Sequence, residues 1–585
     1  MAHREALRLT ALLIIACSLL GGCAGGTSSG VDSLIAPAGT TAQQDSLPVP
    51  EGYRSKAWGT VAVKSLEVRL GGNESFSEAY LVLVSHTATC DETGHPVNVS
   101  FEFSNPAKAL RGGSAPLRLI PGRPEQGARS GCEGTAGRTY LGFHEAVTGT
   151  YAEMAGKSLY PRILTTQELI ATGKIDSGGA LVIDKAGDSR TFTIYNLVTN
   201  EVREKPCTCR HVGERCYVYM DNDDASCYSD MKSYASQVAG YFDSTVSPLV
   251  HQHIGTEWSP GIDGDPRVYL VFSRDKGTAN ICPFDYYPRA ELSVSNQCEA
   301  VYFNPVLFDA TRPAEETFSD MKPTLGHEFT HLVRFSMKFL IPPGGAEKWA
   351  DFSARYPQDR GIDEGTAIFT ENILLQGGIS SNSTKLSPAR ASQLDDYLSA
   401  TELYPPFSYS LCNAKDPVPP KFMYYAPGMT ITDFLYEKDG FEAIARLNQN
   451  DGTVGLSSCR AASSAFDSLY DRLALSYALS GETADPAYTI QSFDLSGKTD
   501  YQGVKLHNVR SFITNCGDYG KGIDVGLLSS PSLVPAMKLY EWAPAYVRFF
   551  NGGGQRLTVT MNILDTQPAA GSEMRGYFFY TPEHK

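Results

Sequence analysis

Short segments of alternating apolar and polar residues, separated by turn residues, dominate the first third of the chain after position 50. The segments at 80–84, 97–103, 191–195 and 216–220 are rich in β-branched and aromatic residues. A period of two is typical of strands, because successive strand side chains point to opposite faces. We therefore expect an N-terminal all-β domain over 51–220, built as a sandwich.

The pattern changes near 228, where apolar residues begin to recur at three- and four-residue spacing, which is typical of helices. The expected elements are a helix at 230–251, strands at 267–272 and 300–304, and helices near 319–340, 363–376, 427–448 and 462–480. Alternation of strands and helices predicts an α+β domain over 221–490. Strand patterns return after about 490 and predict a small C-terminal β domain over 491–585. The predicted fold class is thus multidomain.

The first 23 residues follow a different pattern, that of an export signal. Arg4 and Arg8 precede an apolar run over 9–20. A run of this length is too short for a membrane span, which needs roughly 20 residues, but it fits the core of a signal peptide. Residues 24–50 are rich in Gly, Ser, Thr, Ala and Pro and predict a flexible tether.

Leu20-Gly21-Gly22-Cys23 at the end of this segment resembles the bacterial lipoprotein signal, in which the cysteine is lipidated. The resemblance implies an exported lipoprotein of the cell envelope, held by a lipid on Cys23. Ala24, rather than Asp, after the cysteine favours the outer membrane or the cell surface. Plain secretion with an incidental Cys23 is the alternative.

Net charge bears on the expected partners, and the cysteines bear on the expected disulfides and metal sites. The 585 residues include 65 acidic and 50 basic side chains, a net charge of -15. Such a chain gains nothing from neutralising phosphates, so we do not expect nucleic acid as a partner. Apart from Cys17 in the signal and Cys23, 11 of the 13 cysteines remain, and export makes disulfides their expected state, with at least one thiol left over. Cys207-Thr208-Cys209 lacks the spacing of a zinc ribbon, so no metal is expected there.

The strongest chemical pattern is His327-Glu328-Phe329-Thr330-His331. Two histidines four residues apart on a helix lie on one face, one turn above the other, and can share a tetrahedral Zn²⁺. Glu328 points elsewhere and can take a proton from a metal-activated water. Pro323 is expected in the first turn of this helix, where its missing N–H costs least.

A third ligand decides the class of metal site. Gly and His are needed at 334 and 337 for the metzincin pattern, and the chain has Arg334 and Met337 instead. The other common solution is a carboxylate on a following helix, for which we select Glu364 because Gly365 beside it would let the histidine helix approach. The remaining candidates are Glu347, Asp351, Asp359, Asp363 and Glu371. Asp363 and Glu371 are also possible outer partners of the histidines.

The histidine motif continues Leu332-Val333-Arg334-Phe335 and is followed by Asp363-Glu364-Gly365-Thr366-Ala367. Over roughly 210–450 the chain thereby resembles the gluzincins, and among them the hyicolysin family of bacterial neutral metallopeptidases. It departs from that family at Thr330, where Gln is usual, and at Gly361-Ile362-Asp363. The resemblance implies a zincin-like catalytic domain, with His327, His331 and Glu364 as zinc ligands and Glu328 as general base.

Two further sites are less well marked. A donor to the oxyanion is expected from Tyr424, Tyr425 or His507; we favour Tyr425, with a packed aromatic ring as the alternative. The acidic turns at 221–224 and 263–265 lack the full calcium-binding loop, and we interpret them as solvated turns.

These patterns predict a zinc metallopeptidase that cleaves protein or peptide substrates from a lipid anchor on the bacterial envelope. The substrate is expected to pair with an edge strand at 301–304. The alternative is a non-catalytic surface adhesin or binding lipoprotein built on a peptidase scaffold. The patterns give no oligomeric state.

Overall fold

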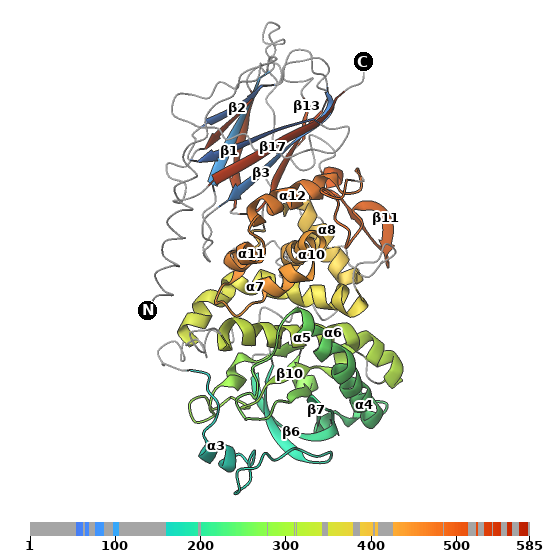
Figure 1. The fold of residues 1–585 in the computed structure, drawn as a ribbon. Helices are drawn as coiled ribbons and strands as arrows, with labels where there is room; N and C mark the ends of the chain where they lie inside the picture. Colours follow the sequence, from blue (N-terminus) through green and yellow to red (C-terminus); the bar gives the residue numbers. More distant parts are fainter. Residues whose placement is uncertain are drawn as a thin grey trace, which may run out of the picture. The chain divides into compact units, whose positions relative to one another are not determined.

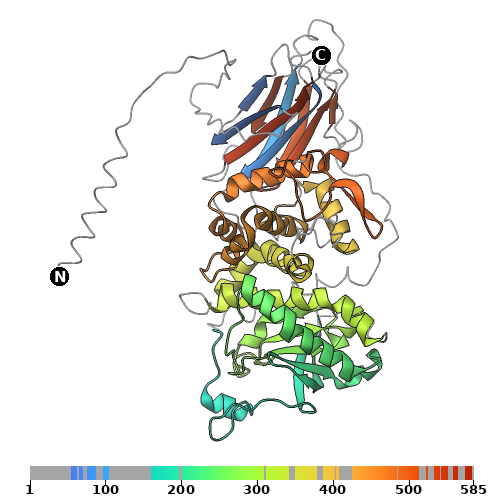
Figure 2. The same cartoon turned by 45° about the vertical axis from the view of Figure 1, so that its right-hand side comes forward.

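The computed structural model mixes strands and helices, as the sequence pattern predicts (Figures 1 and 2). The described residues are 54–61, 65–69, 76–86, 97–104, 160–196, 201–277, 279–308, 311, 313–341, 349–377, 386–401, 404–407, 425–483, 485–512, 522–524, 532–540, 542–550, 558–563 and 573–582. Cys23 and the predicted signal and tether lie outside them. Within the described residues, no helix has both the length and the apolar character needed to cross a membrane.

A mixed sheet of six strands supports the helix that carries the histidine motif. Its order is β5 (Ser189–Asn196), β6 (Glu201–Val212), β7 (Cys216–Asp221), β8 (Val268–Phe272), β10 (Ala300–Phe303) and β9 (Asn280–Ile281). The central strands β7, β8 and β10 are parallel and buried throughout. Helices cover one face, and an aromatic layer that includes Tyr217, Tyr269 and Tyr302 fills the other.

The helices predicted from apolar spacing are present. Their bounds are α3 Thr166–Ala171, α4 Met231–Tyr241, α5 Ser247–His253, α6 Ala314–Phe335, α7 Trp349–Asn372, α8 Pro388–Ser399, α10 Tyr425–Leu447, α11 Gly455–Ala462, α12 Phe466–Leu479 and α13 Val509–Phe512. Single turns lie at η2 Asn222–Cys227, η3 Phe242–Val246, η4 Arg274–Lys276, η5 Pro283–Tyr286, η6 Pro305–Phe308, η7 Ser336–Leu340 and η8 Leu374–Gln376. Helix α7 packs against both α6 and α10.

Helix α6 begins earlier than predicted, at Ala314, so Pro323 lies in the helix interior and not in the first turn. An interior proline removes one backbone hydrogen bond and crowds the preceding turn. The helix nevertheless continues, because Leu325, Phe329 and Leu332 are fully buried behind it. Tertiary packing of this apolar face supplies most of the helix stability, and local spacing does not reveal it.

Strands from the two ends of the chain pair with each other. One sheet has the order β1 (Arg54–Val61), β17 (Glu573–Pro582), β3 (Phe76–His86), β15 (Ala545–Phe550), β13 (Gly522–Asp524); the other has β14 (Ser532–Leu539), β4 (Val97–Ser104), β16 (Thr558–Ile563), β2 (Ser65–Arg69). A separate hairpin joins β11 (Ser496–Tyr501) to β12 (Val504–His507).

This pairing differs from the prediction of separate N- and C-terminal β domains. β3 lies between two C-terminal strands, β17 and β15, and β4 lies between β14 and β16. The strands of 189–221 belong to the six-stranded sheet instead. Residues Thr40–Lys585 together form one compact unit. Two-residue periodicity identifies strands, but it does not identify partners hundreds of residues away.

The seven described cysteines are free thiols, so the expected disulfides do not form among them: Cys207, Cys209, Cys216, Cys227, Cys282, Cys298 and Cys459. Most are buried in the core. Burial raises the pKa of Cys282 to about 12, which keeps its thiol protonated. Such cysteines pack as small apolar side chains.

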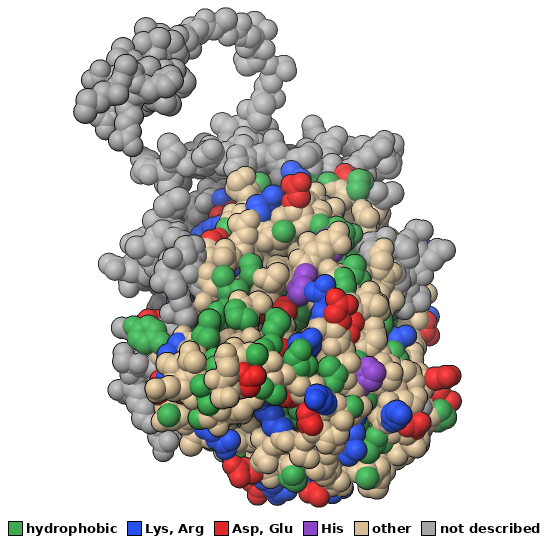
Figure 3. All heavy atoms as spheres, turned by 60° about the horizontal axis from the view of Figure 1, so that its bottom comes forward, with side chains coloured by type: hydrophobic (Ala, Val, Ile, Leu, Met, Phe, Trp, Pro, Cys, Tyr) green, Lys and Arg blue, Asp and Glu red, His purple; other side chains and the backbone are tan. Residues whose placement is uncertain are grey.

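Basic and acidic side chains are interspersed on the face that lies lowest in Figure 1, as Figure 3 shows. Strand β6 contributes exposed ion pairs there, among them Arg203 with Glu201, and Glu204 with Arg289. Exposed pairs add little to stability. The acidic surplus of the chain is therefore not gathered into a single patch on this face.

Candidate metal centre

Three side chains from two helices meet in the core beside the six-stranded sheet. Helix α6 presents His327 and His331 one turn apart, and their Nε2 atoms lie 3.2 Å from each other. Glu364 of α7 places Oε2 at 3.4 Å from each Nε2 atom. All three side chains are buried. Among the described residues, these three form the group whose ligand atoms approach closely enough to hold a metal ion.

The spacing of the three atoms fits a tetrahedral metal site. Ligands bound at about 2.0–2.1 Å in a tetrahedron lie roughly 3.3–3.4 Å apart, close to the separations between His327, His331 and Glu364. Oε2 of Glu364 is buried and accepts no hydrogen bond from any described residue. A buried carboxylate oxygen without a partner is costly, and a divalent cation would satisfy it.

The outer nitrogen of each histidine faces a further carboxylate of α7. His331 Nδ1 lies 2.9 Å from Asp363 Oδ2, and His327 Nδ1 lies 3.3 Å from Glu371 Oε2. Arg390 donates to the other oxygen of Glu371 at 2.8 Å. Carboxylates in this position hold each ring with Nε2 turned inward. The sequence analysis considered both as outer partners, and the structure places both beside the rings.

The surrounding carboxylates control protonation in the centre. Burial disfavours a charged ring, but Asp363 and Glu364 outweigh it and raise the pKa of His331 well above its usual value. Burial opposes ionisation of Glu364 as well, yet the two histidines lower its pKa well below the usual range. Burial raises the pKa of Glu328, with the histidines opposing it. A field that draws a proton to a buried ring also favours a divalent cation in its place.

Small residues let the helices approach closely, although Gly365 does so on a different side from the one predicted. A Cβ at Gly365 would lie 2.2 Å from the carbonyl oxygen of Gly428, so this glycine faces α10 and not α6. The contact between α6 and α7 uses Thr330 instead, whose hydroxyl donates to Thr370 Oγ1 at 2.9 Å. The departure from Gln at position 330 thus gives a hydrogen bond between the two ligand-bearing helices.

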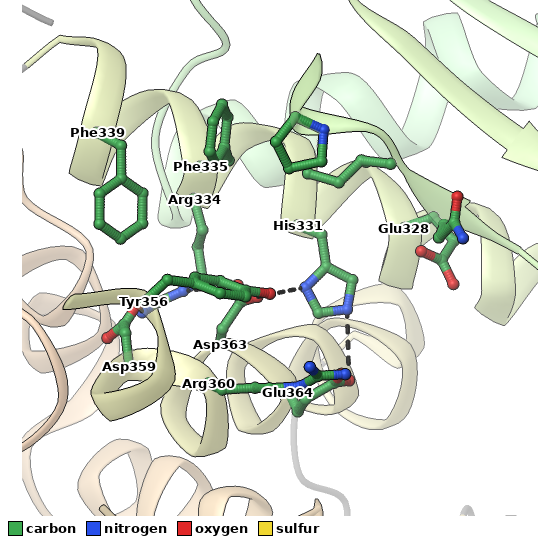
Figure 4. Close-up of a pocket in the computed structure, with 13 residues that line it drawn as sticks. Glu328, His331, Arg334, Phe335, Phe339, Tyr356, Asp359, Arg360, Asp363 and Glu364 are labelled. Carbon is green, nitrogen blue, oxygen red and sulfur yellow. Dashed lines mark hydrogen bonds and ion pairs between the residues drawn. The ribbon is translucent and has the colours of Figure 1, made fainter. Parts of the chain in front are cut away.

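A pocket lies beside the three ligand atoms (Figure 4). Glu328 and Phe339 lie at opposite ends of it, and His331 lies between them. The lining residues are Asn280, Ile281, Pro283, Glu328, His331, Arg334, Phe335, Phe339, Tyr356, Asp359, Arg360, Asp363 and Glu364. The pocket therefore has a polar end at the ligand group and an aromatic end formed by Phe335, Phe339 and Tyr356.

Asn280 is a pocket residue that sequence reasoning missed. It lies on β9, its side chain is 8% exposed, and neither Oδ1 nor Nδ2 has a hydrogen-bond partner among the described residues. A buried amide with two open polar atoms is costly unless a molecule in the pocket pairs with it. No sequence signal distinguishes this asparagine from one in a turn.

The open edge of the sheet also differs from the prediction. An edge strand was predicted at 301–304, but β10 pairs with β8 on one side and β9 on the other. The edge beside the pocket is therefore β9, whose two residues Asn280 and Ile281 both line it. A strand of two residues carries too little periodicity to be found from the sequence.

Two of the three candidates for an oxyanion donor do not line this pocket. Tyr425 is buried at the start of α10, its ring centroid lies 4.8 Å from the guanidinium of Arg390, and it is not among the pocket-lining residues. His507 is 43% exposed and also lies outside the pocket lining. Tyr424 falls outside the described residues.

The other candidate third ligands do not join the group. Asp359 pairs with Arg334 at 2.7 Å, and Asp351 is exposed. Glu347 falls outside the described residues. The acidic turns contain buried carboxylates, contrary to the prediction of solvated turns: Asp221 and Asp263 are at most 1% exposed, Asp221 accepts from a serine, and Asp263 lies 3.2 Å from a lysine ammonium.

A comparison with curated proteins finds one metalloprotease that is similar to this chain. The neutral metalloprotease ShpI of Staphylococcus hyicus is 25% identical over 206 residues, which are 34% of this chain and 43% of that protein. The match thus spans less than half the length of that relative. No protein-family model matches the chain. The chain thus combines a distant similarity to a metalloprotease with a group of three residues that could hold a metal ion.

Proposed function

We propose that this chain is a zinc-dependent endopeptidase whose metal is held by His327, His331 and Glu364. The observation that carries the proposal is the convergence of three buried ligand atoms, two of them on side chains that line a pocket together with Glu328. The distant similarity to a metalloprotease supports it. A histidine and carboxylate donor set with an open position suits catalytic zinc.

The chain's own residues supply the remaining chemistry. Zinc, when bound, provides Lewis acidity that polarises a carbonyl and acidifies water. Asp363 and Glu371 favour a proton on Nδ1 of each ring, which leaves Nε2 free as a ligand atom. Glu328 accepts the proton of the attacking water, and its burial, which raises its pKa, brings it closer to the pH at which it must work.

We propose that the substrate binds as an extended peptide along the edge strand β9. The pocket beside β9 is lined by Glu328 and by two of the ligand side chains, His331 and Glu364, and the amide of Asn280 offers one donor and one acceptor to a peptide main chain. The aromatic end formed by Phe335, Phe339 and Tyr356 would accept an apolar side chain. This places the substrate one strand further out than the sequence analysis did.

Glu328→Gln separates metal binding from catalysis. We expect casein hydrolysis to fall by about 10²- to 10⁴-fold while zinc content stays at the wild-type level. Glu315→Gln, an exposed change in the first turn of the same helix, is the matched control and should leave both unchanged. A chelator should stop cleavage by the wild type, and added zinc should restore it. A fully active Glu328→Gln protein would disprove the assignment. A wild type that binds zinc but cleaves nothing would favour the scaffold alternative.

The proposed place of action is the bacterial cell envelope, with Cys23 as the site of the lipid. It is supported by the sequence of the first 23 residues alone. Cys23→Ser should move the protein from the membrane fraction to the soluble fraction, and retention in the membrane fraction would contradict the lipid anchor.

A further inference from the structure

Arg334 is a buried guanidinium for which the proposed chemistry has no role. It follows His331 by three residues on α6 and is 1% exposed. Its Nε donates to Asp363 Oδ1 at 3.1 Å, and Nη2 donates to Asp359 Oδ2 at 2.7 Å. A buried charge of this kind is tolerated only with good partners, and these carboxylates, one turn apart on α7, provide them.

The two oxygens of Asp363 are divided between the arginine and the metal centre. Oδ1 accepts from Arg334, whereas Oδ2 lies 2.9 Å from His331 Nδ1 and accepts from the hydroxyl of Tyr356 at 3.1 Å. Figure 4 shows Asp363 between His331 and Arg334. The contact with Arg334 fixes the plane of this carboxylate, and through it the orientation of the His331 ring.

The same guanidinium reaches the segment 448–455 that joins α10 to α11. Nη1 of Arg334 donates to Oδ1 of Asn448. Asp359, the second carboxylate on the arginine, accepts from the backbone N–H of Gly455 at 2.8 Å. The segment is therefore tied to the ligand-bearing helices by a chain of contacts that ends at a metal ligand.

We propose that Arg334 is a positioning residue of the metal centre, which holds Asp363 against His331 and ties this pair to segment 448–455. The role rests on the proposed function, because it requires that His331 binds the metal. A lysine could not replace it: a planar guanidinium can serve two carboxylates and an amide at once, whereas an ammonium on a flexible stem does not fix their planes.

Arg334→Lys tests the proposal in the full-length protein loaded with Co²⁺, whose visible absorption reports the ligand geometry. We expect the absorption bands to shift and a chelator to remove the metal about 10- to 100-fold faster than from the wild type. Arg460→Lys is the matched control, because Arg460 pairs with Asp467 at 2.9 Å outside the centre, and it should change neither readout. A folded Arg334→Lys protein with the wild-type spectrum and release rate would overturn the proposal.

Asp359→Asn provides the second test if Arg334→Lys does not fold. It keeps Arg334 and Asp363 but removes one charge that holds the guanidinium in place. Metal release should again be faster than in the wild type, by a smaller factor, and an unchanged rate would overturn the positioning role. The two proposals fail separately: a wild type that binds no metal refutes the proposed function, whereas a wild type that binds it beside an unaffected variant refutes only the role of Arg334.

Discussion

Among the described residues, buried histidine lies beside carboxylate in two clusters, which differ in where their polar atoms point. In the metal centre, two histidines and Glu364 direct their ligand atoms at one another beside a pocket. In the second cluster, His86 of β3 lies 2.7 Å from Asp471 Oδ1 of α12. The other oxygen of Asp471 accepts from Arg575 at 2.9 Å and from Tyr577 at 2.5 Å.

In the second cluster the Asp471 carboxylate is fully paired, whereas Nδ1 of His86 has no hydrogen-bond partner among the described residues and lies 3.9 Å from Asp467 Oδ2. Both oxygens of Asp471 accept hydrogen bonds, and the His86 ring packs on Trp542 with centroids 4.3 Å apart. None of its members lines the pocket. We interpret it as a structural joint between the strands β3 and β17 and helix α12. Burial and residue types are similar in the two clusters. The metal centre differs in having a carboxylate oxygen, Glu364 Oε2, that has no hydrogen-bond partner among the described residues and faces two histidine nitrogens beside a pocket.

Replacing the central carboxylate of each cluster in turn should give the largest expected difference, which is a difference in metal affinity. A zinc site of four ligands is worth roughly 10–16 kcal/mol, so Glu364→Ala should weaken metal binding by several kcal/mol, about a thousandfold or more. Asp471→Asn should leave metal affinity unchanged. Zinc content after dialysis against a competing chelator measures both. Full zinc occupancy in Glu364→Ala would remove Glu364 from the ligand set.

Stability should respond in the opposite sense. Asp471→Asn leaves Arg575 with a weaker partner in a buried network, and disruption of such a pair costs about 3–5 kcal/mol. Urea unfolding of the metal-free protein should therefore shift to lower denaturant concentration for Asp471→Asn. Glu364→Ala should shift the unfolding midpoint much less. In the metal-free protein, Oε2 of Glu364 has no hydrogen-bond partner among the described residues, so the substitution breaks no hydrogen bond of that atom. Equal shifts of the urea midpoint in the two variants would contradict the interpretation of the second cluster as a structural joint and of the first as a metal site.

The contrast also explains what the sequence could reveal. His327 and His331 lie on one helix, so their spacing alone places both rings on one face. Asp363 and Glu364 share the next long helix, and Glu364 was selected by residue type and by Gly365 beside it. The structure includes Glu364 in the ligand group, although Gly365 faces α10 and not the histidine helix. His86 and Asp471 are 385 positions apart, and their contact depends on sheet and helix packing that no local pattern encodes.

The remaining features of the site depend on tertiary structure in the same way. Asn280 lies on a strand of only two residues. Its significance comes from the absence of a hydrogen-bond partner for its amide among the described residues, which only the three-dimensional structure can show. Tyr425 was selected by its position before a helix, but that helix packs its first residue against Arg390. Residue types in sequence order do not reveal which side of a helix meets the pocket.

Asn280 offers a smaller effect that is specific to the pocket. Asn280→Ala should lower kcat/KM by about tenfold, since one hydrogen bond to a substrate is worth roughly 0.5–1.5 kcal/mol. Asn304→Ala is the control: its Oδ1 accepts from the backbone of Val306 at 3.0 Å, and it does not line the pocket. Peptide cleavage assays should separate the two. Equal losses in both variants would mean that Asn280 acts through folding and not through substrate.

The smallest expected effect is the pH dependence of the second cluster. Burial opposes a charge on His86, but Asp471 and Asp467 outweigh it and raise the pKa of His86 above its usual 6.5. The folded state then binds more protons than the unfolded state between these two pKa values. The stabilisation from His86 is therefore fully present below about 6.5 and is lost as pH rises through the folded-state pKa.

The metal centre must depend on pH with the opposite sign, because its histidines lose protons to bind a cation and metal affinity rises with pH. We therefore expect the unfolding midpoints of the metal-free wild type and His86→Gln to differ more at about pH 6 than at about pH 9, while zinc affinity increases over the same interval. If the difference in unfolding midpoint between the wild type and His86→Gln is the same at both pH values, His86 carries no extra proton in the folded state. The joint would then act through hydrogen bonding and packing alone, and only the metal centre would contain charged histidine.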